Sequence, residues 1–126
     1  MAKDKKAIEK RMISGELPPI VREISSNGWM TSDFDEQNKL PPISGVYMFI
    51  DVYEEIRTGK LNDRPLYIGI ARSLKARHAS HPIRKIIPIT RACHVWYKPV
   101  SESNLFEKEQ YLIQNFQPIL NIRGVC

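Results

Sequence analysis

The sequence predicts a small α+β domain, in which a three-stranded antiparallel sheet is flanked by helices and preceded by an N-terminal helical extension. Three short segments rich in β-branched and aromatic residues, 45–50, 65–69 and 93–97, are the expected strands. Helices are expected over 74–81 and 105–116. The resulting order of strand, strand, helix, strand, helix favours a sheet covered by helices over a parallel α/β arrangement.

The first part of the chain, residues 1–42, forms the expected extension and contains two short helices. Residues 3–14 form a strongly charged helix, and Pro18–Pro19 fits the start of a second helix, because proline is favoured in the first helical turn. Residues 29–42 are expected to be irregular. Residues 43–126 then form the second unit, which contains all the expected strands.

The middle of the chain is expected to form a hairpin followed by a helix. Segments 45–50 and 65–69 are expected to pair antiparallel, and the polar, acidic residues 51–63 between them form an extended connection that looks like a hairpin insertion. Ser73 is placed to cap the following helix over 74–81, because its hydroxyl can accept a hydrogen bond from a free N–H of the first turn.

The last helix carries a carboxylate on its apolar side. Asn104 and Glu107 fit an asparagine version of the capping box at its start, and Pro118 ends it. At about 100° per residue, Glu109 falls within the apolar stripe of this helix. A salt bridge to an arginine and a functional role explain this costly position equally well. The stripe consists of Leu105, Phe106, Leu112, Ile113 and Phe116.

Two basic side chains share one face of the helix over 74–81. Arg77 and His81 are four residues apart, and Leu74 falls on the same side of the helix and is expected to anchor that face to the core. This arrangement would place Arg77 and His81 at the edge of the buried surface, close to the sheet. An exposed basic helix, with His81 as a helix-end charge, is the alternative.

The composition is that of an ordinary water-soluble domain. The 126 residues suffice for one domain, and no apolar run approaches the roughly 20 residues that cross a bilayer, so no membrane partner is expected. The charged N-terminus has no apolar core and is not a secretory signal. Cys93 and Cys126 form no CxxC pair and are expected to be reduced thiols, which predicts a cytoplasmic location.

The positive charge is concentrated in residues 64–98. The whole chain has a formal net charge of +5, whereas this segment contains eight basic residues, no acidic residue and all three histidines, His78, His81 and His94. A long segment of one sign favours contact with phosphate groups. The eight basic residues are Arg64, Arg72, Lys75, Arg77, Arg84, Lys85, Arg91 and Lys98.

Several of these features resemble the signature of the GIY-YIG nuclease family. The first half of the signature stands here as Gly45-Val46-Tyr47, and the second as Tyr67-Ile68-Gly69. Arg77 follows ten residues after Tyr67, and His81 comes four residues later, where that family has its arginine and its histidine or tyrosine.

The end of the chain extends the resemblance to residues 43–123, which is essentially a whole catalytic module. Glu109 and Asn121, the last residue of the run 117–121, have the relation of the family's metal-binding glutamate and late asparagine. One feature departs from the repair and intron homing members of the family. The two signature tyrosines are twenty residues apart, because segment 51–63 is inserted between the two halves.

The resemblance implies a metal-dependent endonuclease that hydrolyses DNA phosphodiester bonds to 5′-phosphate and 3′-hydroxyl ends. Glu109 would hold one Mg²⁺ or Mn²⁺ ion, and Arg77 would grip the phosphate. Tyr67 would orient or deprotonate the attacking water, and Tyr47 would hydrogen-bond Tyr67 or that water. His81 would relay a proton or contact phosphate.

Other residues would then support the site. Gly45 and Gly69 would allow close approach of the backbone, and Asn121 would fix a strand or helix end by hydrogen bonding. General contacts with DNA phosphates would come from Arg72, Lys75, Arg84 and Lys85.

Two alternatives stay open: a catalytically silent nucleic-acid-binding module of the same fold, and a structural protein whose signature reflects ancestry. Residues 1–42 are the one candidate for a DNA-reading element, and they contain no recognition motif. Short or weak sequence preference is therefore expected, or reliance on a homodimer. Cutting both strands with one active site requires either a dimer or two successive nicks.

Overall fold

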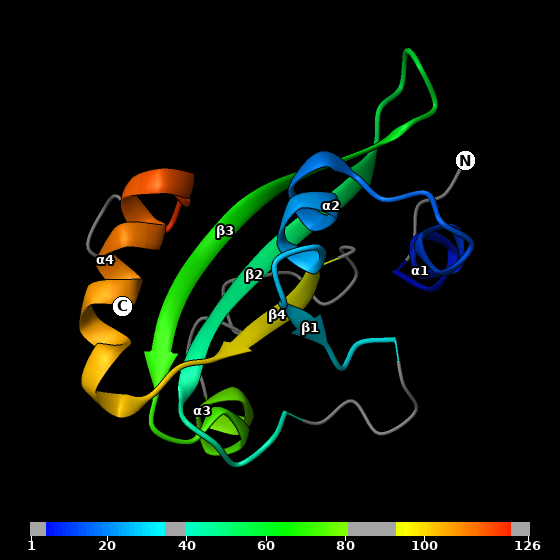
Figure 1. Ribbon diagram of the computed structural model, residues 1–126. Coiled ribbons are helices and arrows are strands. Elements are labelled where there is room, and N and C mark those ends of the chain that lie inside the picture. Colours follow the sequence, from blue (N-terminus) through cyan, green and yellow to red (C-terminus); the bar gives the residue numbers. More distant parts are fainter. Residues whose placement is uncertain (1–4, 35–39, 81–92, 122–126) are drawn as a thin grey trace.

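The computed structural model describes residues 5–34, 40–80 and 93–121, with the backbone alone for residues 79 and 80 (Figure 1). Its architecture is α+β, which confirms the predicted class. The elements in chain order are α1 (Lys5–Ile13), α2 (Pro19–Ser25), β1 (Met30–Thr31), β2 (Gly45–Glu54), β3 (Leu61–Ala71), α3 (Leu74–Ser80), β4 (Cys93–Pro99), the 3₁₀ helix η2 (Glu102–Asn104) and α4 (Leu105–Phe116).

The sheet has four strands, in the order β1-β4-β2-β3, so the prediction of three strands is wrong. Every neighbouring pair is antiparallel. The additional strand, β1, lies within residues 29–42, which were expected to be irregular. Thr31 of β1 pairs with Trp96, and its hydroxyl donates a hydrogen bond to the carbonyl of Val95 at 2.8 Å. Two residues are too few to show an alternating pattern, so partners distant in the sequence define this strand.

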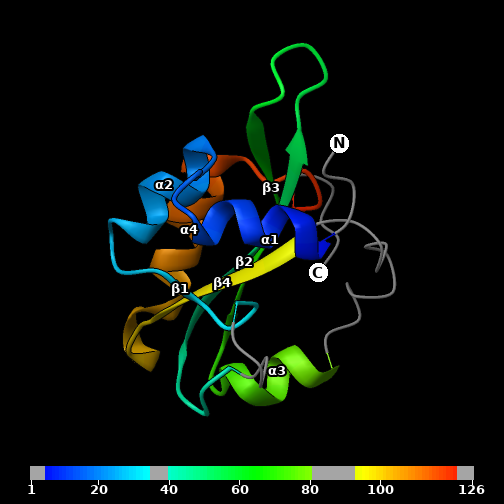
Figure 2. The same cartoon turned by 90° about the vertical axis from the view of Figure 1, so that its right-hand side faces the viewer.

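Strands β2 and β3 form one long antiparallel hairpin, which confirms their predicted pairing. The inserted segment 51–63 mostly continues these two strands, and residues 55–60 form the turn between them. One register shift between Phe49 and Ile50 interrupts the ladder, and such a bulge increases the bend and twist of a strand. The turn projects beyond the rest of the domain, at the end of the sheet opposite α3 (Figures 1 and 2).

Side chains of β2 alternate between the two faces of the sheet and contribute to two separate cores. On the face covered by α1 and α2, the first core includes Ile8, Met12, Val21, Ile24, Val46, Met48, Ile50, Val52 and Leu112 of α4. On the other face, the second core includes Leu40, Tyr47, Phe49, Tyr67, Val95 and Leu74 of α3. The helices of residues 1–42 therefore bury their apolar sides against the same sheet that carries the signature strands.

A carboxylate from a neighbouring strand caps the start of helix α2. Asp63 of β3 is buried, and its two oxygens accept hydrogen bonds from the backbone N–H groups of Ile20 and Val21, at 3.1 and 2.8 Å. Burial raises the pKa of Asp63, and the two backbone hydrogen bonds oppose that rise. Because the first N–H groups of a helix have no partner within it, Asp63 takes the place of a capping side chain and joins α2 to the sheet.

The start of helix α4 differs from the predicted capping box. Asn104 makes no side-chain hydrogen bond to the helix, and its amide nitrogen instead donates to the hydroxyl of Ser101 at 3.0 Å. The 3₁₀ helix η2 continues directly into α4, so the backbone is already helical where α4 begins. Phe106 was expected on the apolar stripe, but it lies outside the part of α4 that packs on the sheet and is 68% exposed.

Removal of the carboxylate that caps α2 is expected to destabilise the domain. The substitution Asp63→Ala leaves two N–H groups at the start of α2 without an acceptor, and we expect the free energy of unfolding to fall by about 2 kcal/mol. Urea denaturation followed by circular dichroism measures the change. The control Glu23→Ala, on the exposed side of the same helix, should change the stability by less than about 0.5 kcal/mol; equal effects would contradict the role of Asp63.

Candidate active site

Two tyrosines from adjacent strands lie together on the face of the sheet that α3 covers. Tyr47 of β2 and Tyr67 of β3 are both buried, and their ring centroids are 6.2 Å apart, with the ring planes inclined at 37°. Phe49 packs edge-on against Tyr47, at 5.9 Å between centroids. The antiparallel pairing of β2 with β3 thus brings together the two signature tyrosines, which are twenty residues apart in the sequence.

Gly69 makes room for the ring of Tyr47. The two residues are direct partners across the β2–β3 ladder. A β-carbon at position 69 would lie 2.5 Å from Cζ of Tyr47 and closer still to its hydroxyl oxygen. No larger residue fits without moving the ring, so the glycine of the second signature half fixes where the Tyr47 hydroxyl lies.

Gly45 has a similar role at the beginning of β2. A β-carbon there would lie 2.5 Å from the carbonyl oxygen of Lys98 in β4 and 2.9 Å from Cδ1 of Leu74 in α3. The close approach expected at this glycine is therefore present, to a neighbouring strand and to a helix at once. As a result, α3 lies close enough to the sheet for its next turn to reach the tyrosines.

Arg77 of α3 joins the helix to both tyrosines. Its Nε donates a hydrogen bond to the Tyr47 hydroxyl at 3.4 Å, and Tyr67 is a further hydrogen-bond partner. These contacts, with that to Tyr47 the largest, raise the pKa of the guanidinium above its ordinary value. Arg77 therefore lies at the edge of the buried surface, beside the sheet, as its spacing from Leu74 predicted.

The hydroxyl of Tyr47 is held in its neutral form. Burial is the main cause of a raised pKa, which the neighbouring Tyr67 and Glu109 also increase and the Arg77 guanidinium opposes. A phenol with a raised pKa is a poor base near neutral pH. Tyr47 accordingly serves as a hydrogen-bonding partner for Arg77. The expected bond of Tyr47 to Tyr67 or to a water molecule stays a prediction.

Glu109 lies on α4, half-buried, and close enough to Tyr47 to influence its pKa. Burial raises the pKa of Glu109 itself, and a hydrogen bond from Gln110 opposes the rise. Among the described residues, no lysine, arginine or histidine forms an ion pair with Glu109. The salt bridge that sequence reasoning left open as an explanation for this carboxylate is therefore not found in that part of the chain.

Asn121 binds the backbone of the strand that carries Tyr67 and Gly69. Its Oδ1 accepts a hydrogen bond from the N–H of Ile68 at 2.8 Å, and its Nδ2 donates to the carbonyl of Ile68 at 3.0 Å. The N–H of Leu120 also donates to the carbonyl of Leu66 at 2.9 Å. Asn121 therefore fixes β3 by hydrogen bonding, at a position inside the strand and not at the expected end, which makes it a positioning residue for β3.

The expected phosphate contacts are only partly described. Arg72 is highly exposed and lies 3.3 Å from a carboxylate oxygen of Glu102, in a surface ion pair of little energetic weight. Lys75 is exposed on α3, on the same helix as Arg77. Three further expected site residues, His81, Arg84 and Lys85, lie outside the described residues.

Sequence reasoning missed two aromatic residues that surround the site. Phe49 packs on the Tyr47 ring, and Tyr97 of β4 is the direct strand partner of Tyr47 on its other side. Both belong to the second core, the first buried in it and the second packed against it. Strict alternation along β2 and β4 was the signal available, because it places these side chains on the same face as Tyr47.

No helix in the described part of the chain is both long and apolar enough to span a bilayer. No protein-family model, curated protein or solved structure matches the chain. The candidate site therefore depends on the geometry of its own residues.

The contact between Tyr47 and Gly69 is testable by a double-mutant cycle. We expect Gly69→Ala to lower the free energy of unfolding by about 1–3 kcal/mol, because the added methyl group overlaps the tyrosine ring. In a Tyr47→Ala background the same substitution should cost much less, because the overlapping ring is gone. Urea denaturation of the four proteins gives the coupling, and costs that simply add would contradict the proposed overlap.

Proposed function

We propose that this protein is a metal-dependent endonuclease of the GIY-YIG type, which hydrolyses phosphodiester bonds in DNA to leave 5′-phosphate and 3′-hydroxyl ends. One observation carries the proposal. Tyr47, Tyr67 and Arg77, which come from three different elements, meet on one face of the sheet, and Glu109 of α4 is close enough to Tyr47 to raise its pKa. Their order and spacing resemble the family's signature. On this proposal DNA is the partner and the expected location is the cytoplasm.

The chemistry of Glu109 fits a hard divalent cation. An ionised carboxylate that is half-buried and has no basic partner among the described residues is unfavourable by itself, as its raised pKa reflects. Carboxylate oxygens are the ligands that Mg²⁺ and Mn²⁺ prefer. When bound, such an ion would neutralise charge on the scissile phosphate and on the leaving 3′ oxygen.

Arg77 is suited to hold the phosphate while negative charge develops on it. A guanidinium group has five N–H donors in a planar fork, so its bonds to the tyrosine hydroxyls leave donors for phosphate oxygens. Tyr47, neutral because of its raised pKa, would keep the guanidinium in place. These contacts orient Arg77 before substrate arrives, which reduces the entropy lost on binding.

Tyr67 is the residue we assign to the attacking water. It lies beside Tyr47 and Arg77, on a strand held by Asn121. In the proposed reaction the water oxygen attacks phosphorus, and Tyr67 orients or deprotonates that water as the bond to the 3′ oxygen breaks. Arg72 and Lys75, exposed near the same end of the sheet, would contact neighbouring phosphates.

The direct test is the conversion of supercoiled plasmid to nicked and linear forms with Mg²⁺ or Mn²⁺. Glu109→Gln and Arg77→Ala should each lower the rate by at least about 100-fold, because each removes a group that stabilises charge in the transition state. Two exposed residues provide matched controls: Glu107→Gln on the same helix as Glu109, and Lys6→Ala on α1. Both controls should cut at the wild-type rate.

The other outcomes separate the competing functions. Equal cleavage by all five proteins would assign the activity to a contaminant and overturn the proposed site. Wild-type protein that binds DNA without cutting it would indicate a silent nucleic-acid-binding module. Circular dichroism and thermal unfolding of each variant ensure that a loss of activity does not reflect a loss of folding.

The raised pKa of Glu109 predicts that metal binding depends on pH. A proton competes with the cation for the carboxylate, and the raised pKa means that protonation begins at a higher pH than for an exposed glutamate. Affinity for Mn²⁺ should therefore fall as the pH is lowered through this raised pKa, and level off above it. Calorimetric titrations at a series of pH values measure this. A pH-independent affinity, or one unchanged in Glu109→Gln, would rule out Glu109 as the ligand.

A further inference from the structure

The inserted hairpin is acidic in sequence, but most of its carboxylates have partners within the fold. Asp51 is buried, and one of its oxygens accepts a hydrogen bond from Nε of Arg64 at 2.9 Å. Glu54 pairs with the guanidinium of Arg11 in α1 at 2.7 Å, and Glu16 shares the same guanidinium. Asp63 is also buried, with both oxygens bonded to the start of α2. Each of these three carboxylates is therefore bonded within the fold.

The exposed side chains of the hairpin turn are therefore more basic than acidic, although the sequence of the insertion is acidic. Arg57 and Lys60 are both exposed there and outnumber Glu55, the remaining acidic residue of the segment. Ile56 lies between Glu55 and these basic residues, and its side chain is 86% exposed. An apolar residue displayed beside basic side chains is typical of protein elements that enter a DNA groove.

The turn is held firmly to the rest of the domain. The N–H of Glu55 donates to the carbonyl of Lys60, and that of Gly59 to the carbonyl of Glu55, both at 2.8 Å. Arg11 donates a further hydrogen bond to the carbonyl of Gly59 at 2.7 Å while it also binds Glu54. Because these bonds order the turn in advance, binding a partner would cost little conformational entropy.

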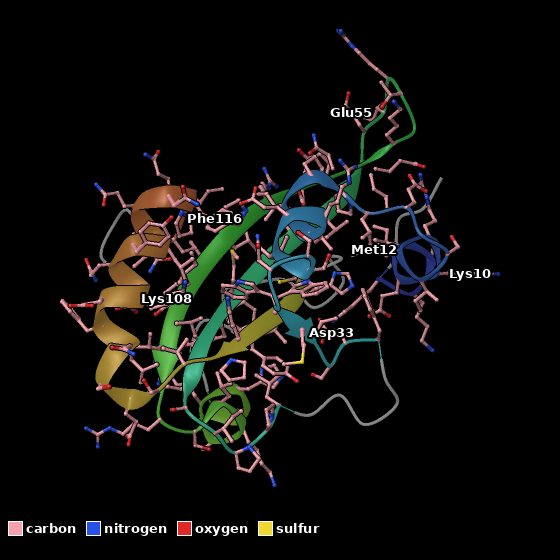
Figure 3. The ribbon with its side chains drawn as sticks, in the orientation of Figure 1. Lys10, Met12, Asp33, Glu55, Lys108 and Phe116 are labelled. Atoms are coloured by element: carbon pink, nitrogen blue, oxygen red, sulfur yellow. The ribbon has the colours of Figure 1, made fainter. Side chains whose placement is uncertain are left out.

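The hairpin separates the turn from the candidate site by less than one turn of duplex DNA. From Tyr47 to Glu54, the last residue of β2, the strand rises by seven residues, which at about 3.3 Å per residue is about 23 Å. One turn of B-DNA is about 34–36 Å long. The turn lies at the opposite end of the sheet from α3, and Glu55 is far from the body of the domain in Figure 3.

We propose that the hairpin turn is a second DNA-binding surface, which contacts the duplex within one helical turn of the candidate site. Arg57 and Lys60 contact phosphates, and Ile56 packs against the wall of a groove. This inference rests on the proposed nuclease function and names its substrate as duplex DNA that extends along the hairpin.

The test measures binding to a duplex of about 30 base pairs at several salt concentrations, with all proteins in the uncleaving Glu109→Gln background. The double variant Arg57→Ala/Lys60→Ala should weaken binding about 10-fold at low salt and reduce the slope of log affinity against log salt by about 2. Ile56→Ser should weaken binding without changing the slope.

The matched control is Lys6→Ala/Lys10→Ala, which removes the same charge from exposed positions on α1; Lys10 points away from the domain in Figure 3. It should leave the affinity and the slope nearly unchanged. If the hairpin variants behave like this control, the second surface is overturned, whereas cleavage of plasmid by the wild type would still support the nuclease. If the Glu109→Gln protein and the wild type in Ca²⁺ do not bind the duplex, the proposed function fails, and the second surface with it.

Discussion

The ring of Tyr47 crosses the strand at Gly69, and the geometry of the candidate site depends on that crossing. Strand pairing places the two residues opposite one another, and the missing β-carbon leaves space for the phenol. Its hydroxyl then reaches Arg77, whose helix approaches the sheet because Gly45 also lacks a side chain. The two glycines thus allow two close approaches. Gly69 lets the ring of Tyr47 lie against β3, and Gly45 lets α3 lie against β2. Propensity alone would disfavour both residues within strands, so close packing is the physical reason for their presence.

Residues distant in sequence stabilise the sheet that carries the site. Helices α1 and α2 cover the face opposite the tyrosines, and the carboxylate of Asp63 ties α2 to β3. Arg11 of α1 links to Glu54 near the end of β2. The N-terminal part of the chain and the signature strands therefore share one hydrophobic core, which lies on the face of the sheet opposite the two tyrosines.

Much of this arrangement follows from local patterns, and the exceptions have a common cause. Alternation and helical periodicity predicted β2, β3, β4 and α4, and the stripe on α4 singled out Glu109. Strand β1 escaped prediction because two residues show no periodicity, and the capping box failed because a 3₁₀ turn precedes α4. The pairing of Glu54 near the hairpin turn was also not predicted, since its partner Arg11 lies 43 residues away in the sequence. Local rules do not contain such tertiary pairings.

A sheet of four strands has two edges, and in the described part of the chain each has a feature that limits the addition of another strand. Along β3, the backbone of Ile68 is bonded to Asn121 and that of Leu66 to Leu120. On the other side the sheet ends in β1, which is only two residues long. Short edge strands, and edges that are already bonded, are poor templates for a strand from another molecule. On the proposed function, we therefore expect two copies that cut both strands of a duplex to meet through helices or side chains, with the ladder of each sheet intact.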